Sequence, residues 1–570
     1  MKNKEIAAIF SRMADALEIQ GEVAFKAIAY RKASRILEDL TEDIETIARE
    51  KRLREIPGIG SGIADKIEEY LKTGRMKKYE EVLAGIPEGL LELLEVQNLG
   101  AKTVKLAHEE LGVKNLPDLK KVIADGSLAR LFGMGAKKVE NIKKGIENYE
   151  RARERISIYE ATAIAEEVVT YLKNSPLVRR LSPAGSLRRM KETIGDIDIL
   201  ASGTNGPDII RTFTEFPGTA RILSAGETKG SIMISTESGE RQVDLRVIEE
   251  SAYGAALQYF TGSKAHNIKL RGMAKDMGLK ISEYGVFKGN KKIAGRDEDQ
   301  VYQALGLPLI PPELREDRGE VERALKNKLP RLVDPSDIQG DLHVHSSYSD
   351  GNLSIEDLAK LARRMGYKYI AICDHSQSVR YAGGLTPERL KQQGAEIEKL
   401  NSTLKGIRIL KGTEVDILSD GRLDFPDNVL KELDLVIAAI HSGFKKNVTE
   451  RILRALENPC VHILAHPSGR LISGREGYDV DLEKVLEAAR KMGKSLELNA
   501  HYDRLDLNEL YLRKAKDMGI TIAIGTDTHY AQGLAMMRFG VGIARRGWLE
   551  KKDILNCLSW TELMKKTKAK

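Results

Sequence analysis

The stretch GDLHVHSSYSDG, residues 340–351, places two histidines one residue apart at the end of an apolar run, with an aspartate five residues later. Core packing gives little reason for this arrangement, because burying polar side chains without partners is unfavourable. In an extended chain, His343 and His345 point to the same side. The stretch therefore predicts a strand that delivers ionisable side chains to a functional site.

From residue 340 onward, strand-like and helix-like patterns alternate. Strand candidates lie near residues 341–345, 369–373, 408–415, 434–440, 461–465, 495–499 and 520–525. Amphipathic helices such as 354–366, 386–403, 482–492 and 507–518 separate most of them. This alternation predicts a parallel sheet that closes into a barrel over residues 340–570.

Histidine usage supports a site at one rim of that barrel. Eight of the ten histidines lie at or after residue 343, and six of these follow or end a strand candidate. The carboxyl ends of parallel barrel strands share one rim, so these side chains should converge. The expected set is His343, His345, Asp350, His375, Glu414, His441, His466, Asp527 and His529.

Nine nitrogen and oxygen ligands exceed the four to six that one ion takes. The set predicts two or three divalent ions, with Glu414 as a bridging carboxylate. The alternative is a group of satisfied core histidines, which nine residues on one rim make a poor explanation. His462 lies within a strand and should pack in the core or support a ligand. His501 fits a substrate contact or a surface position equally well.

The motifs DLHVHSSYSDG and GTDTH resemble the PHP superfamily, named for polymerase and histidinol phosphatase. The resemblance covers residues 340–570 and implies a distorted (β/α)7 barrel with a trinuclear site that hydrolyses phosphoesters. Each family ligand position is filled here, which implies an active site. Mn²⁺ and Zn²⁺ both suit mixed histidine and carboxylate ligands. Such ions activate water and stabilise the attacking and leaving oxygens.

A second candidate site lies upstream, in GSLRRMKETIGDIDIL, residues 185–200. Asp196 and Asp198 are two residues apart in a predicted strand, so both carboxylates share one face. Asp244, in RQVDLRV, lies in another strand. Three facing acids repel one another unless cations lie among them. Oxygen ligands alone suit Mg²⁺, which also takes phosphate oxygens.

These residues resemble the nucleotidyltransferase superfamily, and specifically the family-X DNA polymerases such as the vertebrate repair polymerase beta. The match runs from residue 1 to about residue 315. It implies that Asp196, Asp198 and Asp244 are catalytic metal ligands and that Asp244 activates the primer 3′-OH. The implied nucleotide-binding residues are Gly185, Ser186, Arg189, Gly195, Tyr259, Phe260, Gly262, Asn267 and Arg271.

Within that set the resemblance implies distinct roles. The segment Tyr259–Gly262 would lie against the incoming sugar and disfavour a ribose 2′-OH. Asn267 and Arg271 would touch the base or the template minor groove. Ser186 and Arg189 would bind the triphosphate, for which hydroxyl and guanidinium groups are suited donors.

Three glycine-containing breaks divide the helical residues 1–150. They are IPGIGSGIADKIEEYL from Ile56, VQNLGAKTVKLAHEEL from Val96 and LFGMGAKKVENIKKGI from Leu131. Their similarity predicts a threefold helix–hairpin–helix repeat, although three ordinary helical hairpins are the alternative. Backbone N–H groups at helix starts can hold phosphates. The predicted DNA contacts are Gly58, Gly60, Gly100, Gly133 and Gly135.

The first hairpin also resembles the small lyase domain of the same polymerases, and Lys66 falls at the position of its Schiff-base lysine. Lys26, Tyr30 and Arg31 match that domain, whereas Phe25, Ala27 and Gly62 replace its His, Tyr and Lys. Lys66 is therefore a candidate nucleophile, with a phosphate contact or a solvated helix lysine as the alternatives.

The whole arrangement resembles the PolX type of family-X polymerase found in bacteria and archaea. The expected parts are a small helical domain, a fingers-like region, a palm, a thumb-like nucleotide-selection subdomain, a linker and the PHP domain, over residues 1–90, 91–150, 151–250, 251–315, 316–339 and 340–570 respectively. We expect a gap-filling repair polymerase with a PHP 3′–5′ exonuclease, and AP endonuclease or 3′-phosphatase activity as further possibilities.

Two other functions remain open at this point. The chain would be a DNA-binding polymerase with a purely structural barrel if the nine ligands bound no metal. It would be a nucleotidyltransferase acting on RNA or a small molecule if the Tyr259 segment did not select deoxyribose. The hairpin repeats and the complete ligand set favour the repair polymerase with an active PHP exonuclease over both alternatives.

Composition agrees with a DNA-binding enzyme without demanding one. The 570 residues carry a net charge of +7, with charges of both signs mixed along the chain. Three distant cysteines indicate reduced thiols. No stretch approaches the ~20 apolar residues of a membrane span. We expect a monomeric, cytoplasmic protein that uses gapped or nicked DNA and dNTPs and contacts no membrane.

Overall fold

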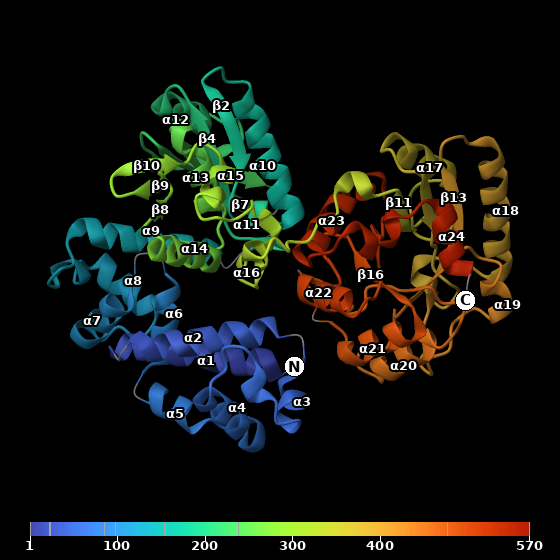
Figure 1. The fold of residues 1–570 in the computed structure, drawn as a ribbon, viewed down its shortest axis with the longest axis horizontal. Helices are drawn as coiled ribbons and strands as arrows, with labels where there is room; N and C mark the ends of the chain where they lie inside the picture. The colour runs from blue at the N-terminus through green and yellow to red at the C-terminus, as the bar shows by residue number, and fades with distance from the viewer. Residues whose placement is uncertain are drawn as a thin grey trace. The chain divides into compact units, whose positions relative to one another are not determined.

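The computed structural model describes residues 2–21, 24–40, 42–84, 86–96, 99–152, 155–236, 239–472, 474–475 and 477–568. The chain divides into two compact units, Met1–Arg155 and Ile156–Lys570, and each is described here by itself (Figure 1). Among the described residues, no helix is long and apolar enough to cross a membrane. Cys373, Cys460 and Cys557 are buried free thiols.

The first unit is helical, as predicted. Its helices are α1 (Lys2–Gln20), α2 (Ala24–Asp39), α3 (Ile44–Arg49), α4 (Ser61–Thr73), α5 (Lys77–Leu83), α6 (Glu88–Glu92), α7 (Ala101–Leu111), α8 (Leu116–Ala124) and α9 (Ala136–Ala152). Short 3₁₀ turns, η1 (Leu53–Glu55), η2 (Leu93–Glu95) and η3 (Leu128–Arg130), precede α4, α7 and α9. Apolar faces of these helices, including Phe10, Ile67 and Ile142, form one core.

The first part of the second unit is built on a mixed sheet. Within the described residues this sheet has five strands in the order β2-β4-β7-β6-β5. They are β2 (Val178–Pro183), β4 (Ile197–Gly203), β5 (Thr219–Ala225), β6 (Lys229–Thr236) and β7 (Gly239–Ile248). Helices α10 (Ile158–Lys173) and α12 (Gly206–Thr214) pack on the sheet. The short helix α11 (Gly185–Arg188) follows β2 and leads back to β4, which runs parallel to β7.

Helices and a small sheet follow β7 along the chain. The elements are α13 (Tyr253–Thr261), α14 (Lys264–Asp276), β8 (Lys280–Ser282), β9 (Gly285–Lys288), β10 (Lys291–Ala294) and α15 (Glu298–Gln303). The segment expected to be a linker contains the helix α16 (Glu320–Leu325), and its Val321 and Ala324 are buried in the same core as Leu270. This segment is therefore packed along part of its length.

The C-terminal part is a parallel β/α barrel. In the described part of the chain, seven strands follow one another in sequence order. They are β11 (Gly340–Val344), β12 (Tyr369–Ile372), β13 (Arg408–Asp416), β14 (Leu435–Ala439), β15 (Ile463–Leu464), β16 (Ser495–Asn499) and β17 (Ile522–Gly525). The predicted strands are confirmed. The first and last strands meet just beyond their ends, where His345 N donates to Thr528 O at 3.0 Å.

Helices surround these strands. They are α17 (Ile355–Arg364), α18 (Pro387–Thr403), α19 (Asp427–Leu430), α20 (Val448–Leu456), α21 (Leu482–Met492), α22 (Glu509–Asp517), α23 (Met537–Arg546) and α24 (Trp560–Lys568). Strand β15, Ile463–Leu464, is shorter than its predicted range of 461–465. The backbone N–H groups of the flanking His462 and Ala465 still donate to Val436 O and Ala438 O on β14, at 3.0 and 2.9 Å.

Candidate metal centres and nucleic-acid interface

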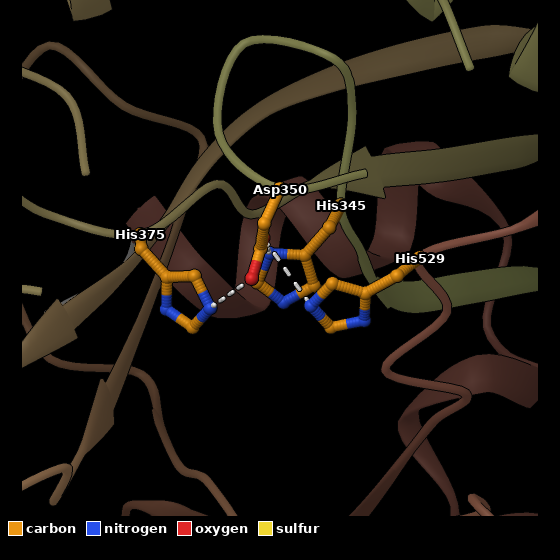
Figure 2. A group of neighbouring side chains, drawn as sticks. All are labelled: His345, Asp350, His375 and His529. Carbon is orange, nitrogen blue, oxygen red and sulfur yellow. Dashed lines mark ion pairs between the residues drawn. The ribbon is translucent and has the colours of Figure 1, made fainter. Parts of the chain in front are cut away.

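The nine predicted barrel ligands converge at the carboxyl ends of the strands. Figure 2 shows four of them, with the carboxylate of Asp350 pointing between three imidazole rings. Asp350 Oδ1 lies 3.3 Å from His529 Nε2, and Asp350 Oδ2 lies 3.6 Å from His375 Nε2. The His345 and His529 rings stack with centroids 4.2 Å apart. These side chains come from the ends of β11, β12 and β17, so the barrel topology brings them together.

Glu414, on β13, lies at the centre of the cluster and is 1% exposed. One carboxylate oxygen is 2.8 Å from His375 Nδ1, and the other is 3.0 Å from His466 Nε2 and 3.4 Å from His441 Nε2. Burial opposes the negative charge, but the surrounding imidazolium groups outweigh burial and hold the pKa of this carboxyl well below its usual range. A carboxylate placed between several rings can bridge two ions.

His343 and His345 complete a third group with Asp527. His345 Nε2 lies 3.2 Å from Asp527 Oδ1, and the Nε2 atoms of the two histidines are 3.1 Å apart. The possible ligand atoms fall into overlapping groups, each spanning no more than 4.8 Å, namely His345/Asp350/His375/His529, His343/His345/Asp527 and His375/Glu414/His441.

Several buried atoms of this cluster form no hydrogen bond of good geometry among the described residues. They are His345 Nδ1, His375 Nδ1 and Glu414 Oε2, and the last two lie 2.8 Å from each other as an ion pair. Such buried polar atoms are rare in proteins unless an ion or water satisfies them. The donor set of imidazole nitrogens and carboxylate oxygens therefore fits divalent Mn²⁺ or Zn²⁺.

Sequence reasoning missed the acids that hold the ligands in place. Glu497, on β16, lies 2.6 Å from His343 Nδ1, and its other oxygen accepts the backbone N–H of His466 at 2.6 Å. Asp416 accepts the backbone N–H of His441 at 3.1 Å and lies 3.3 Å from the ring Nδ1 of that residue. Hydrogen bonds of this kind fix the orientation and tautomer of metal-binding histidines. The available signal was an acid flanked by two apolar residues within each of the strand stretches SLELN and EVDIL.

The two histidines left outside the set differ in their surroundings. His462 hydrogen-bonds to the backbone through Val436 N and Thr567 O, which agrees with the structural role favoured by its position in a strand. His501 stacks on Tyr502 with ring centroids 4.6 Å apart. Burial lowers the pKa of His501, and the charge of Asp527 opposes that change. His501 therefore lies beside the cluster.

A cleft opens beside His441. Its volume is about 330 Å³, and it is lined by Ser378, Val379, Tyr381, Asp416, Leu418, Ser419, Asp420, Arg422, His441 and Ser442. Tyr381 is 81% exposed, which is unusual for a large ring at the edge of a polar cleft. Exposed aromatic rings of this kind can stack on nucleic-acid bases.

In the mixed sheet, Asp198 on β4 pairs in register with Asp244 on the parallel strand β7, and Asp196 lies one residue before β4. Burial together with the charges of Asp244 and Asp196 raises the pKa of Asp198 to about 7. Lys229 Nζ lies 2.9 Å from Asp244 Oδ2. Three clustered carboxylates supply only oxygen donors, which is the donor set that Mg²⁺ prefers.

Gly185 is required by its contact with this acidic group. A Cβ at residue 185 would lie 2.3 Å from Asp198 Oδ2, and the backbone φ there is +59°. Glycine therefore lets the turn of α11, with Ser186, approach the carboxylates closely. Gly195 directly precedes Asp196 in the turn before β4.

The predicted nucleotide-binding residues also lie together. Arg189 Nη1 donates to Thr261 O at 2.5 Å, which joins α11 to the turn after α13. Asn267 is 8% exposed, and its Nδ2 donates to Tyr259 O at 2.7 Å. The rings of Tyr259 and Phe260 meet edge to face at 5.2 Å.

Two arginines of this set have protein partners. Arg189 Nε lies 3.1 Å from Glu316, and Arg271 Nε donates to Asn267 O at 3.3 Å. Proximity of these residues to one another agrees with a nucleotide site, while their roles stay predictions.

The hairpins place glycines at the starts of helices. Gly60 and Gly100 are the N-cap residues of α4 and α7, and Gly135 O accepts the N–H of Lys138 at the start of α9. Gly58 and Gly133, two residues earlier in their hairpins, have φ of +94° and +76°. Residues 97 and 98 of the second hairpin lie outside the described residues. Free N–H groups at these helix starts suit phosphate binding.

Lys66 is half-buried on α4. Its Nζ donates to Gly62 O at 2.7 Å and lies 5.9 Å from the centre of the Tyr30 ring. Phe25, which replaces the histidine of the lyase domain, is 77% exposed. The contacts described for Lys66 include no carboxylate or imidazole that would activate its amine.

Comparison with known proteins gives four family matches. They are Helix-hairpin-helix domain over residues 1–76, SAM-like Helix-hairpin-helix tandem over 90–148, DNA polymerase beta thumb over 256–316 and PHP domain over 341–501. The chain is 40% identical over 564 residues to DNA polymerase/3′-5′ exonuclease PolX of Bacillus subtilis, covering 98% of both chains.

The barrel also has relatives that lack the polymerase part. A probable phosphatase of Thermoanaerobacter sp. is 32% identical over 231 residues, which are 38% of this chain and 89% of the relative. A probable phosphatase of Caldanaerobacter subterraneus is 33% identical over 211 residues, which are 33% of this chain and 75% of the relative.

Fold, sites and comparisons together define a family-X polymerase core joined to a PHP barrel. The identity extends along nearly the whole chain rather than along single domains. The chain belongs to the PolX family of DNA polymerases.

Proposed function

We propose that the chain is a gap-filling DNA polymerase whose PHP barrel is a metal-dependent 3′–5′ exonuclease. One observation carries the proposal. The chain aligns over 98% of its length with a PolX polymerase/exonuclease. It holds a group of carboxylates around Asp198 and, separately, a histidine-rich cluster around Glu414. The first suits nucleotidyl transfer, and the second suits phosphoester hydrolysis.

In the polymerase half, Asp196, Asp198 and Asp244 would hold Mg²⁺, which supplies charge stabilisation to the reacting phosphate when bound. Asp244 accepts the proton of the primer 3′-OH. Gly185, Ser186 and Arg189 hold the triphosphate, and Gly195 gives the backbone room before Asp196. The Tyr259–Gly262 turn excludes a ribose 2′-OH, while Asn267 and Arg271 contact the base or the minor groove.

In the barrel, the nine residues from His343 to His529 would hold two or three ions of Mn²⁺ or Zn²⁺, which supply an activated water when bound. Glu414 would be a carboxylate shared by two ions, and the hydrogen bond from Glu497 would keep the His343 ring in a ligating tautomer. Tyr381 at the cleft beside His441 can stack on the terminal base. The probable phosphatases that match the barrel favour 3′-phosphatase activity as a second function, and AP endonuclease activity also stays a proposal.

The hairpins of residues 1–150 would bind the phosphates of gapped or nicked DNA through Gly58, Gly60, Gly100, Gly133 and Gly135. We further propose the domain limits 1–90, 91–150, 151–250, 251–315, 316–339 and 340–570, with a monomer as the working form. Lys66 remains a candidate lyase nucleophile, although its contacts with Gly62 and Tyr30 support a phosphate contact equally well.

The deciding experiment uses a 5′-labelled primer in gapped DNA, with Mg²⁺ or Mn²⁺ and with or without dNTPs. The proposal predicts extension with dNTPs and stepwise shortening from the 3′ end without them. Primer extension with dNTPs but no shortening without them would indicate that the barrel has only a structural role. Preference for RNA ends or ribonucleotides would favour a different nucleotidyltransferase.

A further inference from the structure

We propose that Arg546, which belongs to the PHP barrel, is a positioning residue for nucleotide binding in the polymerase half. The inference rests on the proposed function, because it takes Arg189 as a ligand of the incoming triphosphate. It extends that function by making a barrel helix part of the nucleotide site.

Arg546 is the last residue of α23, and its side chain is 1% exposed. Its Nη1 donates to the Arg189 carbonyl at 2.7 Å and to Glu316 Oε1 at 3.0 Å. Its Nη2 donates to Glu509 Oε1 at 2.8 Å. The buried guanidinium of Arg546 thus connects the barrel both to the backbone of Arg189 and to Glu316, the ion-pair partner of Arg189.

Glu316 is the point at which the two arginines meet. Its Oε1 receives both Arg189 Nε at 3.1 Å and Arg546 Nη1 at 3.0 Å. A carboxylate in a poorly solvated position attracts a guanidinium strongly. With Arg546 present, the charge of Glu316 is shared, so Arg189 can turn toward a phosphate without leaving Glu316 unpaired. Without Arg546, Glu316 would compete with the triphosphate for Arg189 alone.

The charges around Arg546 also favour an added anion. Arg318 Nη1 lies 3.3 Å from the Glu509 oxygen that Arg546 binds. The guanidiniums of Arg189, Arg318 and Arg546 therefore face the carboxylates of Glu316 and Glu509. These five side chains carry three positive and two negative charges. A triphosphate bound at Arg189 would therefore offset the excess positive charge.

The neighbouring Arg545 offers a matched control. It is on the same helix and also crosses to the polymerase part, where it contacts Glu313 at 2.7 Å and Val333 O at 2.8 Å. These partners do not include Arg189 or Glu316. Arg545→Gln therefore removes an ion pair of the neighbouring residue, at a less buried position, and leaves the proposed connection intact.

The experiment measures KM for dNTP and kcat on gapped DNA for full-length wild type, Arg546→Gln, Arg546→Lys, Arg545→Gln and Arg546→Gln/Glu316→Gln. Exonuclease rate and melting temperature report folding. We expect Arg546→Gln to raise KM roughly tenfold, with a smaller change in kcat. Arg546→Lys should lie between it and wild type. Removing the competing carboxylate in the double variant should bring KM back toward the wild-type value, and Arg545→Gln should leave KM unchanged.

An unchanged KM in a folded Arg546→Gln or Arg546→Lys variant would overturn the inference. A double variant no better than Arg546→Gln would also overturn it, because loss of Glu316 would then bring no relief. An equal KM increase in Arg545→Gln would reduce the effect to general loosening of the interface. A wild-type chain that incorporates no dNTP would instead overturn the proposed function, and this inference with it.

Discussion

Asp198 on β4 lies in register with Asp244 on the neighbouring parallel strand β7. Burial and the nearby charges of Asp244 and Asp196 raise the pKa of Asp198 to about 7. Far along the chain, Glu414 occupies the corresponding central position among the barrel histidines. The two acidic centres come from separate stretches of sequence, so substitutions should affect them separately.

Glu414→Gln should reduce the metal content of the barrel. Both oxygens of Glu414 face imidazole nitrogens, and an amide cannot replace a bridging carboxylate. After loading with Mn²⁺ or Zn²⁺ and gel filtration, we expect two to three ions bound by the wild-type barrel, and at least one fewer in the variant. Elemental analysis provides the measurement. Glu398→Gln changes an exposed barrel glutamate and serves as the control. Equal metal content in all three proteins would rule out a bridging role.

Replacing Tyr259 or Phe260 by alanine should change sugar selectivity. The Tyr259 carbonyl is fixed by buried Asn267, so the turn presents a defined wall to the sugar. We expect the dNTP/rNTP preference to fall roughly tenfold, while DNA affinity changes less. Single-nucleotide incorporation with each nucleotide measures the ratio. Tyr284→Ala, which removes an exposed ring away from this turn, is the control. Equal use of dNTPs and rNTPs by the wild-type enzyme would disprove steric exclusion of the ribose 2′-OH by this turn.

Gly135→Asp should weaken DNA binding without unfolding its hairpin. A side chain at this position meets no atom within 4 Å, and aspartate is a favourable residue at a helix start. Its charge would repel a phosphate bound there, so we expect affinity for gapped DNA to fall about tenfold at low salt. Fluorescence anisotropy at several salt concentrations measures this change. Gly135→Asn has the same size without the charge. Equal losses in both variants would contradict a phosphate contact.

The ion pairs of Glu298 should contribute stability that disappears in acid. Burial opposes its charge, but Arg188 at 2.8 Å and Arg315 at 2.5 Å outweigh burial and lower the pKa of Glu298 to about 2. Because this pKa lies below the ordinary value of 4.5, the contribution is complete above pH 4.5 and is lost as pH falls toward 2.

Glu298→Gln tests this contribution. We expect the variant to lose about 3 kcal/mol at pH 7, because buried Arg315 and partly buried Arg188 lose their carboxylate. The difference from wild type should shrink between pH 4.5 and pH 2. Fluorescence of Trp548, which is buried in the same core as Tyr302, follows unfolding. A difference that stays constant across this range would show that ionisation of Glu298 is not its source.

Local patterns in the sequence were sufficient to predict the barrel and the convergence of nine ionisable side chains at one rim. Alternating apolar runs marked the strands, and the position of His375 or Glu414 at a strand end placed each at one rim. The supporting acid Glu497 was harder to predict because its partner, His343, is 154 residues away. Its contact exists only after the strands have assembled.

The ion-pair partners of Arg189 could not be predicted for the same reason. Its carboxylate, Glu316, lies in a stretch that looks like a charged linker, and Arg546 is 230 residues beyond Glu316. In a helix sequence, a charged residue such as Arg546 is ordinarily assigned to the solvent-facing side. Burial between two domains reverses that assignment, and no local pattern reports it.

The most direct test of two separate active sites measures both activities on one 5′-labelled, gapped duplex. Asp244→Ala removes a carboxylate from the polymerase site, and Glu414→Ala or His441→Ala removes a ligand from the barrel cluster. The account predicts that Asp244→Ala loses nucleotide addition by orders of magnitude and keeps 3′–5′ degradation, whereas the barrel variants do the reverse. Degradation that vanishes in Asp244→Ala, or that survives Glu414→Ala in a nuclease-free preparation, would contradict it.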